Sequence, residues 1–310
     1  MWKISSGIFM GWSLGANDSA NIFGTAVATG VVKYSIAVSL TAIFVMMGAI
    51  LEGPKCMATV GSVSRLSPMG AFGCSLATAI TIAFLTYLAI PASTSQGIIG
   101  AVLGAGIISG TADFSKLYKI VVCWLFTPVA ACILSLCLYR LLGYAMKRSS
   151  FGIAKKNLLL SSGLILAGCY GAYCLGSNNV ANVTGVYVSS GLLAAETAAV
   201  IGGMSIASGV LTYSKKVMMT VGKGIVPLDP FSAFITMLSE AISLHLFTQL
   251  GVPVSSSQAI VGAVVGIGYA GDSRTISKKM LVKVGLGWLA TPLLAGVLSF
   301  ISLKIMKMIS

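Results

Sequence analysis

The chain alternates long, predominantly apolar stretches with short gaps that hold most of its charged residues. Such stretches cover residues 36–51 (preceded by Val31 and Val32), 71–90 and 117–142. A helix needs about 20 apolar residues to cross the hydrocarbon of a bilayer. Backbone groups inside a bilayer must also be paired within the protein, which favours helices. The pattern therefore predicts an all-α polytopic membrane protein.

Composition supports this prediction and narrows the class. Of the 310 residues, 56% are hydrophobic and 9% are charged, and the mean hydropathy is +0.96. A soluble domain of this length cannot place so much apolar surface in water. Nearly the whole chain is therefore expected to be membrane domain, with membrane lipids around it and no soluble enzyme domain left over.

Two motifs occur twice, in the same order. GANDSAN at 15–21 returns as GSNNVAN at 176–182, an offset of 161. PASTSQGIIGAVLG at 91–104 returns as PVSSSQAIVGAVVG at 253–266, an offset of 162. Weaker echoes keep the same order: KCMATVG at 55–61 with KVMMTVG at 216–222, and WLFTP at 124–128 with WLATP at 288–292. Four matches in register indicate an internal duplication.

The duplication predicts a transmembrane repeat over 1–146, a short basic linker over 147–156 and a second transmembrane repeat over 157–310. A short linker suits an odd number of crossings per half, so we expect inverted-topology repeats whose equivalent residues meet at one central site. Broken helices and re-entrant half-helix hairpins are expected to build that site.

The net charge of +13 comes from 20 Lys and Arg against 7 Asp and Glu. The linker cluster Lys147, Arg148, Lys155 and Lys156 predicts a multi-pass protein of the cell membrane with a cytoplasmic linker, by the positive-inside rule. Clusters at 215–223 and 274–283 are nearly as basic, so other orientations stay open. The cations are dispersed among the spans, which argues against nucleic-acid binding.

The first duplicated motif places amides and a carboxylate inside apolar helices, where unpaired polar groups are costly. We expect the glycines to let these helices unwind, so that carbonyls face a cation and amides face an anion. A purely structural alternative is that the asparagines form hydrogen bonds with neighbouring helices. The Asp18 carboxylate could be satisfied by a bound Na⁺ or a proton. The structural alternatives are that it caps a helix or pairs with a Lys. The residues concerned are Gly15, Asn17, Asp18 and Asn21 in the first copy and Gly176, Asn178, Asn179 and Asn182 in the second.

The second duplicated motif follows a Pro with three hydroxyl residues and a Gln, and then with an apolar run too short to span a bilayer. We predict a re-entrant half-helix whose hydroxyls cap its first turn and whose positive dipole end forms an anion cradle. A purely structural turn is the alternative. The residues are Ser93, Thr94, Ser95 and Gln96, and Ser255, Ser256, Ser257 and Gln258.

None of the four motifs contains Lys or Arg. An anion bound there would need co-bound cations to offset its charge, which favours symport with Na⁺ beside Asp18. An aquaporin-like channel is a remote alternative, because it too has duplicated Asn motifs, but the Asn-Pro-Ala box is absent and an Asp in the pore would be unusual.

The sequence lacks the residue patterns that the enzyme mechanisms considered for it would need. An intramembrane aspartyl protease needs two carboxylates, and the counterpart of Asp18 is Asn179. His245 has no Glu at metal-ligand spacing and is expected to be packed or interfacial. Glu52 and Glu240 fit either an ion path or a loop or helix-end role. The seven Cys lack metal or disulfide spacing and are expected to be packing residues. No enzyme activity and no cofactor are expected.

The paired Asn motifs, each followed by a Pro-x-Ser-Thr/Ser-x segment, resemble the inorganic phosphate transporter (PiT) family of cation-coupled phosphate symporters, some of whose prokaryotic members are sulfate permeases. The resemblance covers essentially the whole chain. It implies an inverted-repeat helical fold, usually a homodimer, that carries inorganic phosphate with Na⁺, or H⁺, between its halves. By motif position it assigns phosphate to Asn17, Asn21, Asn178, Asn182, Ser93, Thr94, Ser95, Ser255, Ser256 and Ser257. Na⁺ is assigned to Asp18, Asn17, Asn178, Asn179, Ser93 and Ser255, with Gly15, Gly176, Gln96 and Gln258 in support.

Three positions depart from that family pattern. Asn179 stands where many members have a second Asp, which leaves the number of cation sites open. Gln96 and Gln258 stand where many members have His. The linker lacks the long loop of eukaryotic members, which suggests a prokaryotic transporter. Phosphate against sulfate and Na⁺ against H⁺ stay open on the sequence.

Overall fold

A computed structural model describes residues 2–88, 90, 92–224, 228–270 and 278–309, and these are helical with short connections. The elements are η1 (Trp2–Ile4), α1 (Ser5–Ala28), α2 (Tyr34–Glu52), α3 (Pro54–Ser62), α4 (Pro68–Tyr87), α5 (Thr94–Ser109), α6 (Phe114–Arg148), α7 (Ile153–Ser189), α8 (Ala195–Tyr213), α9 (Lys215–Gly224), α10 (Pro230–Gln249), α11 (Ser256–Ala270) and α12 (Lys278–Ile309). The expected all-α class is confirmed.

Seven helices within the described ranges are long and apolar enough to cross a membrane: α2, α4, α6, α7, α8, α10 and the 284–306 part of α12. α1 is 24 residues long but carries the polar motif, and it is not among them. α5 and α11, of 16 and 15 residues, are shorter apolar helices. The chain is a multi-pass membrane protein, and the half-helices have the length that the sequence predicts.

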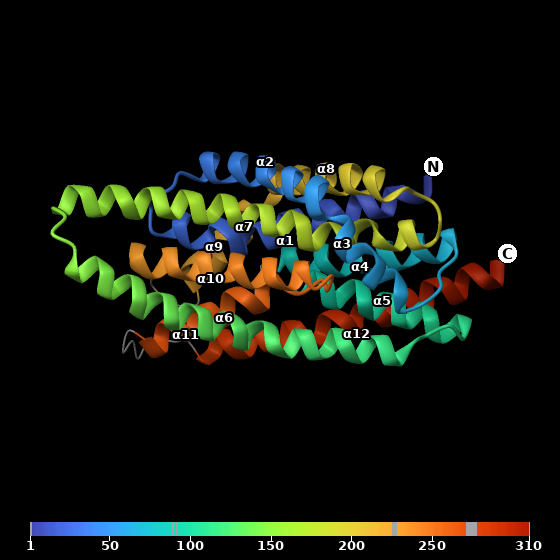
Figure 1. Cartoon of the computed structure of the whole chain (residues 1–310). Coiled ribbons are helices and arrows are strands. Elements are labelled where there is room, and N and C mark those ends of the chain that lie inside the picture. The colour runs from blue at the N-terminus through green and yellow to red at the C-terminus, as the bar shows by residue number, and fades with distance from the viewer. Residues whose placement is uncertain (1, 89, 91, 225–227, 271–277, 310) are drawn as a thin grey trace.

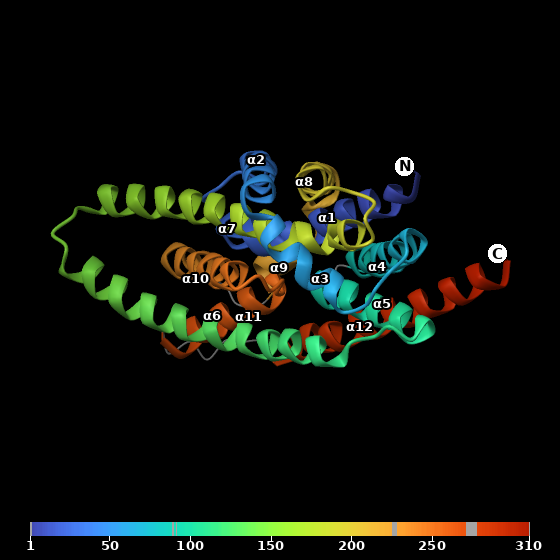
Figure 2. The same ribbon diagram turned by 45° about the vertical axis from the view of Figure 1, so that its right-hand side comes forward.

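The two ends of the molecule carry different parts of the chain. Both termini lie at one end, and the connection between α6 and α7 lies at the other (Figure 1). The hairpins α4–α5 and α10–α11 enter from opposite ends, so that their tips approach the middle of the molecule (Figures 1 and 2).

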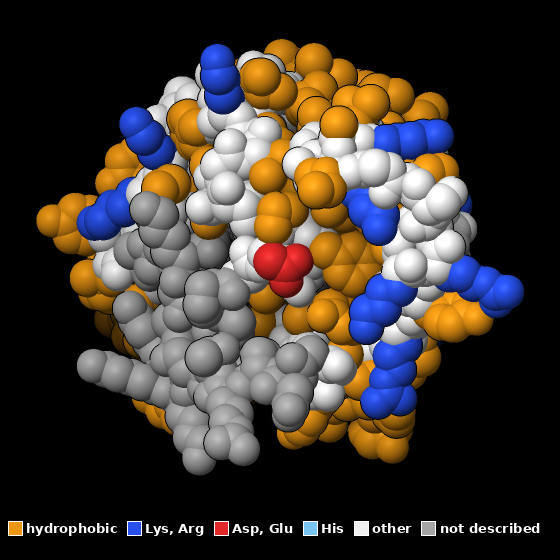
Figure 3. All heavy atoms as spheres, turned by 90° about the vertical axis from the view of Figure 1, so that its left-hand side faces the viewer, with side chains coloured by type: hydrophobic (Ala, Val, Ile, Leu, Met, Phe, Trp, Pro, Cys, Tyr) orange, Lys and Arg blue, Asp and Glu red, His pale blue; other side chains and the backbone are white. Residues whose placement is uncertain are grey.

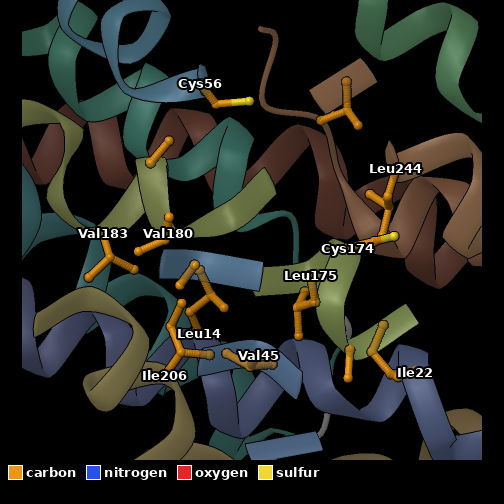
Figure 4. Packing of buried hydrophobic residues seen from close by; sticks show 14 of the residues in the cluster. Leu14, Ile22, Val45, Cys56, Cys174, Leu175, Val180, Val183, Ile206 and Leu244 are labelled. Carbon is orange, nitrogen blue, oxygen red and sulfur yellow. The ribbon is translucent and has the colours of Figure 1, made fainter. Parts of the chain in front are cut away.

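The halves interlock and do not form separate bodies. α5 packs mainly on α12, α11 on α6, α2 on α7, and α1 on α8. In each of these pairs one helix comes from the first half and one from the second. The largest hydrophobic cluster is likewise shared: α1, α2, α7, α8 and α10 contribute side chains such as Leu14, Val45, Leu175, Ile206 and Leu244 (Figure 4).

The expectation that the helices unwind at Gly15 and Gly176 is wrong, because α1 and α7 run unbroken through both Asn motifs. The glycines serve close packing. A Cβ at Gly15 would collide with the carbonyl oxygen of Ile206 in α8, and one at Gly176 with that of Val45 in α2. The helix breaks lie elsewhere, at Gly53 between α2 and α3 and at Ser214 between α8 and α9.

Candidate substrate and ion site

Each hairpin tip is closed by a serine cap. α5 begins at Thr94, and the hydroxyl of Ser93 accepts from the backbone N–H of Gln96 at 3.4 Å. At α11 the hydroxyl of Ser255 accepts from the N–H of Gln258 at 3.3 Å. The predicted hydroxyl caps are therefore present in both copies. Pro253 precedes the second tip, whereas Pro91 lies outside the described residues.

Asn17 holds the first hairpin together. Its Nδ2 donates to Thr86 Oγ1 at 2.8 Å and to the Ile90 carbonyl at 3.3 Å, and its Oδ1 accepts from the N–H of Ala92 at 3.1 Å. These contacts join the end of α4 to the segment that leads into α5.

Asn178 does the same for the second hairpin. Its Nδ2 donates to Thr248 Oγ1 at 2.9 Å and to the Val252 carbonyl at 3.2 Å, and its Oδ1 accepts from the N–H of Val254 at 2.8 Å. Partner for partner, the contacts match those of Asn17. Both amides are thus hydrogen-bonded to backbone groups and a threonine. This fits the structural alternative, hydrogen bonding to neighbouring segments, for this pair of asparagines.

Other motif residues reach across between the halves. Asn182 Nδ2 in α7 donates to Ser95 Oγ at the first hairpin, at 2.8 Å. Asn21 Nδ2 in α1 donates to Ser256 Oγ at the second hairpin, at 3.0 Å. The Ser95 hydroxyl also lies 2.8 Å from the Val254 carbonyl. The structure therefore brings all four motifs together, although they are far apart in the chain.

Asp18 and its counterpart Asn179 are both buried. Asp18 Oδ2 accepts from Thr94 Oγ1 at 2.8 Å. Asn179 Oδ1 accepts from Asn182 Nδ2 at 2.8 Å and lies 3.2 Å from the Ser95 hydroxyl. Asp18 is not a helix cap and has no Lys partner among the described residues, so neither structural alternative for it holds.

The site keeps buried polar atoms without hydrogen-bond partners, and most are oxygens. Buried groups of this kind normally find partners, so a cluster of them needs an explanation. Oxygen is the ligand type that hard cations prefer. Among the described residues around the site, the unpaired atoms are Asp18 Oδ1, Gln96 Oε1, Asn182 Oδ1, Glu240 Oε1 and Gln258 Oε1, and the amide nitrogen Asn179 Nδ2.

Glu240 lies in the central site although it belongs to none of the duplicated motifs. It lies inside α10, is 1% exposed, and interacts electrostatically with Asp18. Its position corresponds to Thr78 by the hairpin offset, so the repeat gives no signal for it. A buried acid in an apolar span was the available signal. The helix-end reading is wrong for Glu240.

The third hydroxyl of the second hairpin has a different environment from its counterpart. Ser257 Oγ lies 2.8 Å from Ser255 Oγ and accepts from Trp288 Nε1 at 3.2 Å. Ser95, at the equivalent position, instead contacts α7 and Val254. The two hairpins are therefore chemically unequal in this structure.

Two lysines related by an offset of 161 lie beside the hairpins. Lys55 Nζ donates to Gln249 Oε1 at the end of α10, at 2.9 Å. Lys216 Nζ donates to the Tyr87 carbonyl at the end of α4, at 2.8 Å. Both lysines are exposed, so each is a cation outside the buried site.

His245 is half-buried and belongs to a polar network, which agrees with the expected packed or interfacial position. Its Nδ1 lies 2.7 Å from the Tyr170 hydroxyl, and its Nε2 lies 3.2 Å from Glu52 Oε2. Glu52 also pairs with Lys55 at 3.3 Å. Glu52 is the last residue of α2, so it has the helix-end position that the sequence allowed.

Fold and site together define a class: a polytopic helical membrane protein with a buried polar centre where two reciprocal hairpins meet. The structure is similar over its whole length to a solved chain called "The sodium-dependent phosphate transporter", with a TM-score of 0.88, 22% identity, and 99% of this chain and 98% of that chain covered. At that identity the likeness establishes the fold.

The model of the phosphate transporter family matches residues 14–299, and the chain belongs to this family. It is 30% identical over 291 residues to "Putative phosphate permease MJ0630" of Methanocaldococcus jannaschii, covering 93% of this chain and 91% of that protein. It is 28% identical over 300 residues to "Sulfate permease CysP" of Bacillus subtilis, covering 95% and 84%. The family is one of permeases and not of enzymes, so the expectation that the chain belongs to a transporter family is confirmed.

Proposed function

We propose that this chain is a secondary active transporter that carries inorganic phosphate together with Na⁺ across the membrane by alternating access. The observation that carries the proposal is the cluster of unpaired buried oxygens where the four motifs meet. Five acceptors and one donor, with no Lys or Arg in the motifs, form a set that needs cations before it can hold an anion.

The proposed division of labour follows the contacts. Asp18 and Glu240 supply charge for Na⁺, with Asn179 and the carbonyl oxygens of Gln96 and Gln258 around them. Phosphate is bound by hydroxyls and N–H groups at the starts of α5 and α11, namely those of Ser93, Thr94, Ser95, Ser255, Ser256 and Ser257, with Asn21 and Asn182. Helix N-termini favour anions through their free N–H groups and their dipole.

Asn17 and Asn178 are proposed as positioning residues and not as ligands. Each uses both ends of its amide to clasp a hairpin tip. These hydrogen bonds fix the position of the serine-rich tip relative to the helix that carries the Asn motif. The geometry of the anion site then depends on these amides, although they need not touch the anion.

Alternating access is proposed to arise from inverted repeats. The chain starts at one end, reaches the α6–α7 linker at the other and returns, a path that supports opposite directions for equivalent helices (Figure 1). The matched clasps of Asn17 and Asn178 support equivalent halves. A central site between inverted repeats can be exposed to either side by rocking one half against the other.

Orientation and assembly complete the proposal. The end that carries the linker shows Lys and Arg side chains around its rim and an acidic group near its centre (Figure 3). We place this end in the cytoplasm and the protein in the cell membrane, by the positive-inside rule. A homodimer remains a prediction from the family resemblance.

Sulfate is the second candidate substrate, because a relative named as a sulfate permease covers 95% of this chain. Proton coupling is the alternative to Na⁺ coupling, because a proton would also satisfy Asp18. Both alternatives use the same hydroxyl and N–H cradle and the same buried acids.

Uptake into proteoliposomes tests the proposal. Radiolabelled phosphate and sulfate are offered with a Na⁺ gradient, with a pH gradient and with neither. We expect phosphate uptake that requires Na⁺ and is lost in Asp18→Asn. Uptake driven by the pH gradient alone would reject Na⁺ coupling, preferential sulfate uptake would change the substrate, and normal Na⁺-dependent transport by Asp18→Asn would reject the cation role of that carboxylate.

A further inference from the structure

A surface pocket of about 450 Å³ lies at the linker end of the molecule, away from the central site. We call it the α6–α10 pocket. It is formed by the end of α6, the start of α10 and the end of α11, and its walls include Tyr139, Arg140, Tyr144, Lys147, Phe231 and Ala270. None of these residues belongs to the duplicated motifs.

The pocket presents two cations on one helix face. Arg140, Tyr144 and Lys147 stand at i, i+4 and i+7 of α6, which places them on the same side of the helix about two turns apart. Arg140 and Lys147 are both exposed. Neither has an ion-pair or hydrogen-bond partner on its side chain among the described residues. Their charges are therefore available to an anionic group in the pocket.

Among the described residues, the acid nearest in sequence to Phe231 of the pocket wall is hydrogen-bonded at the start of its own helix. Asp229 caps α10: its Oδ1 accepts from the N–H groups of Phe231 and Ser232, and its Oδ2 accepts from the Ser232 hydroxyl. The carboxylate is thus committed to the helix start. Asp229 is not among the described residues that line the pocket, whose charged side chains are those of Arg140 and Lys147.

Aromatic rings from α6 and α10 also line the pocket. The rings of Tyr139 and Phe231 lie 5.3 Å apart in a tilted arrangement. Tyr144 accepts a 2.8 Å hydrogen bond from Arg148, one turn further along α6. Aromatic rings combined with Arg and Lys at the end of a span are typical of the membrane interface.

At the level of the pocket and from there towards the middle of the molecule, α6 exposes apolar side chains. Leu141 is 64% exposed, Ile133 55% and Leu125 67%. A molecule with a charged head and apolar tails would therefore find cations and aromatic rings at the pocket and exposed apolar side chains of α6 beside it. A free inorganic anion would use only the first part.

We propose that the α6–α10 pocket binds the phosphodiester headgroup of an anionic phospholipid from the leaflet at the linker end. Arg140 and Lys147 pair with the headgroup charge, the Tyr139–Phe231 pair contacts the glycerol region, and the acyl chains lie along α6. Basic pockets between helices at the cytoplasmic interface are suited to anionic headgroups. The binding site is independent of the transported substrate.

The duplication supplies a natural comparison at the other end. A pocket of about 440 Å³ there is lined by Arg65, Met69, Ile108 and Leu303, among others. The offset of 162 relates Met69 to Phe231 and Ile108 to Ala270, and the offset of the WLFTP motif, 164, relates Leu303 to Tyr139. The geometry recurs, but both members of the aromatic pair are replaced and Arg65 is the lining cation. We expect this pocket to discriminate less between lipid headgroups.

Native mass spectrometry of the purified full chain in detergent tests the proposal. Phosphatidylglycerol and phosphatidylcholine of equal chain length are titrated in separate series. We expect the phosphatidylglycerol dissociation constant to rise about 30-fold in Arg140→Gln/Lys147→Gln, since each cation contributes about a fivefold factor near an anionic surface. Phosphatidylcholine binding should not change.

Two controls remove charge elsewhere. Lys155→Gln/Lys156→Gln takes the same charge from the linker at the same end, and Arg65→Gln takes one cation from the related pocket. Both should change phosphatidylglycerol binding by no more than about twofold, because neither touches the α6–α10 pocket. If the linker variant weakens binding as strongly as the pocket variant, general surface attraction accounts for the lipid and the proposal is wrong.

The remaining arms separate a lipid from a free anion and from misfolding. Millimolar inorganic phosphate should not displace phosphatidylglycerol, and displacement would make the pocket a small-anion site and overturn the lipid assignment. Arg140→Lys/Lys147→Arg keeps both charges and should bind like the unaltered chain, which controls for damage to the fold. Unchanged lipid binding in the Gln pair would also overturn the proposal, whatever the transport assays show.

Discussion

The side-chain amide of Asn182 donates a 2.8 Å hydrogen bond to the hydroxyl of Ser95, 87 positions earlier in the chain. Asn182 belongs to the second half and Ser95 to the first. The same amide nitrogen also donates to Asn179 Oδ1, at 2.8 Å. One side chain thus connects the second Asn motif to the first hairpin, and movement of one half against the other must stretch or replace this contact.

Removing hydroxyls from the hairpin tips should weaken phosphate binding more than folding. Each of Ser93→Ala and Ser255→Ala removes a group proposed to bind the anion, and a hydrogen bond to a charged group is worth about 1.5–3 kcal/mol, or roughly tenfold or more in affinity. Phosphate affinity by scintillation proximity measures the first effect, and thermal unfolding in detergent the second. Unchanged affinity in both variants would contradict the cradle at the hairpin tips.

Glu240→Gln should raise the Na⁺ concentration required for half-maximal uptake. The change keeps the shape of the side chain but removes a buried carboxyl group that interacts with Asp18 and that we propose as a Na⁺ ligand. We expect the Na⁺ dependence to move by about tenfold, with a smaller effect on phosphate affinity at saturating Na⁺. Glu196→Gln, which alters an exposed acid in the first turn of α8, is the control and should behave like the unaltered chain.

The clasp on the second hairpin predicts a stability difference between two threonines of α10. Thr248→Val removes the acceptor of Asn178 Nδ2 and should lower the free energy of unfolding by about 1–3 kcal/mol. Thr236 is equally buried but donates only to the carbonyl four residues earlier, so Thr236→Val should have a smaller effect. Denaturant or thermal unfolding of both variants measures the difference; equal losses would mean that the Asn178 clasp adds nothing.

Gly176→Ala should impair folding, because the added methyl group would meet the backbone of α2 at Val45. Overpacking of this kind costs about 1–3 kcal/mol or more. Gly285→Ala is the matched control in another helix, since no atom lies within 4 Å of its added Cβ. That variant should be neutral or slightly stabilising, by up to about 1 kcal/mol. Comparable yields of folded protein from both variants would show that α2 and α7 can separate without loss.

The class of fold followed directly from the sequence, because hydropathy over about 20 residues reports on the solvent that a helix meets. The serine caps were also predictable, since a hydroxyl before a helix start has one favourable use, at the free N–H groups. Repetition of the Asn and Ser motifs was enough to mark them as a common site.

Three features depended on the packing of distant segments. Glycine in an apolar helix is compatible with both unwinding and close packing, and only the position of the α8 and α2 backbones against Gly15 and Gly176 distinguishes the two. Asparagine can bind a ligand or hold a loop in place, and only the tertiary structure shows that Asn17 and Asn178 are hydrogen-bonded to Thr86 and Thr248. Glu240 gains its place at the centre because α10 passes Asp18. The chemistry of a residue can be predicted from the sequence, whereas its contact partners are set by how the helices pack. Here those partners lie far away in the chain, and some, such as Ser95 for Asn182, lie in the other half.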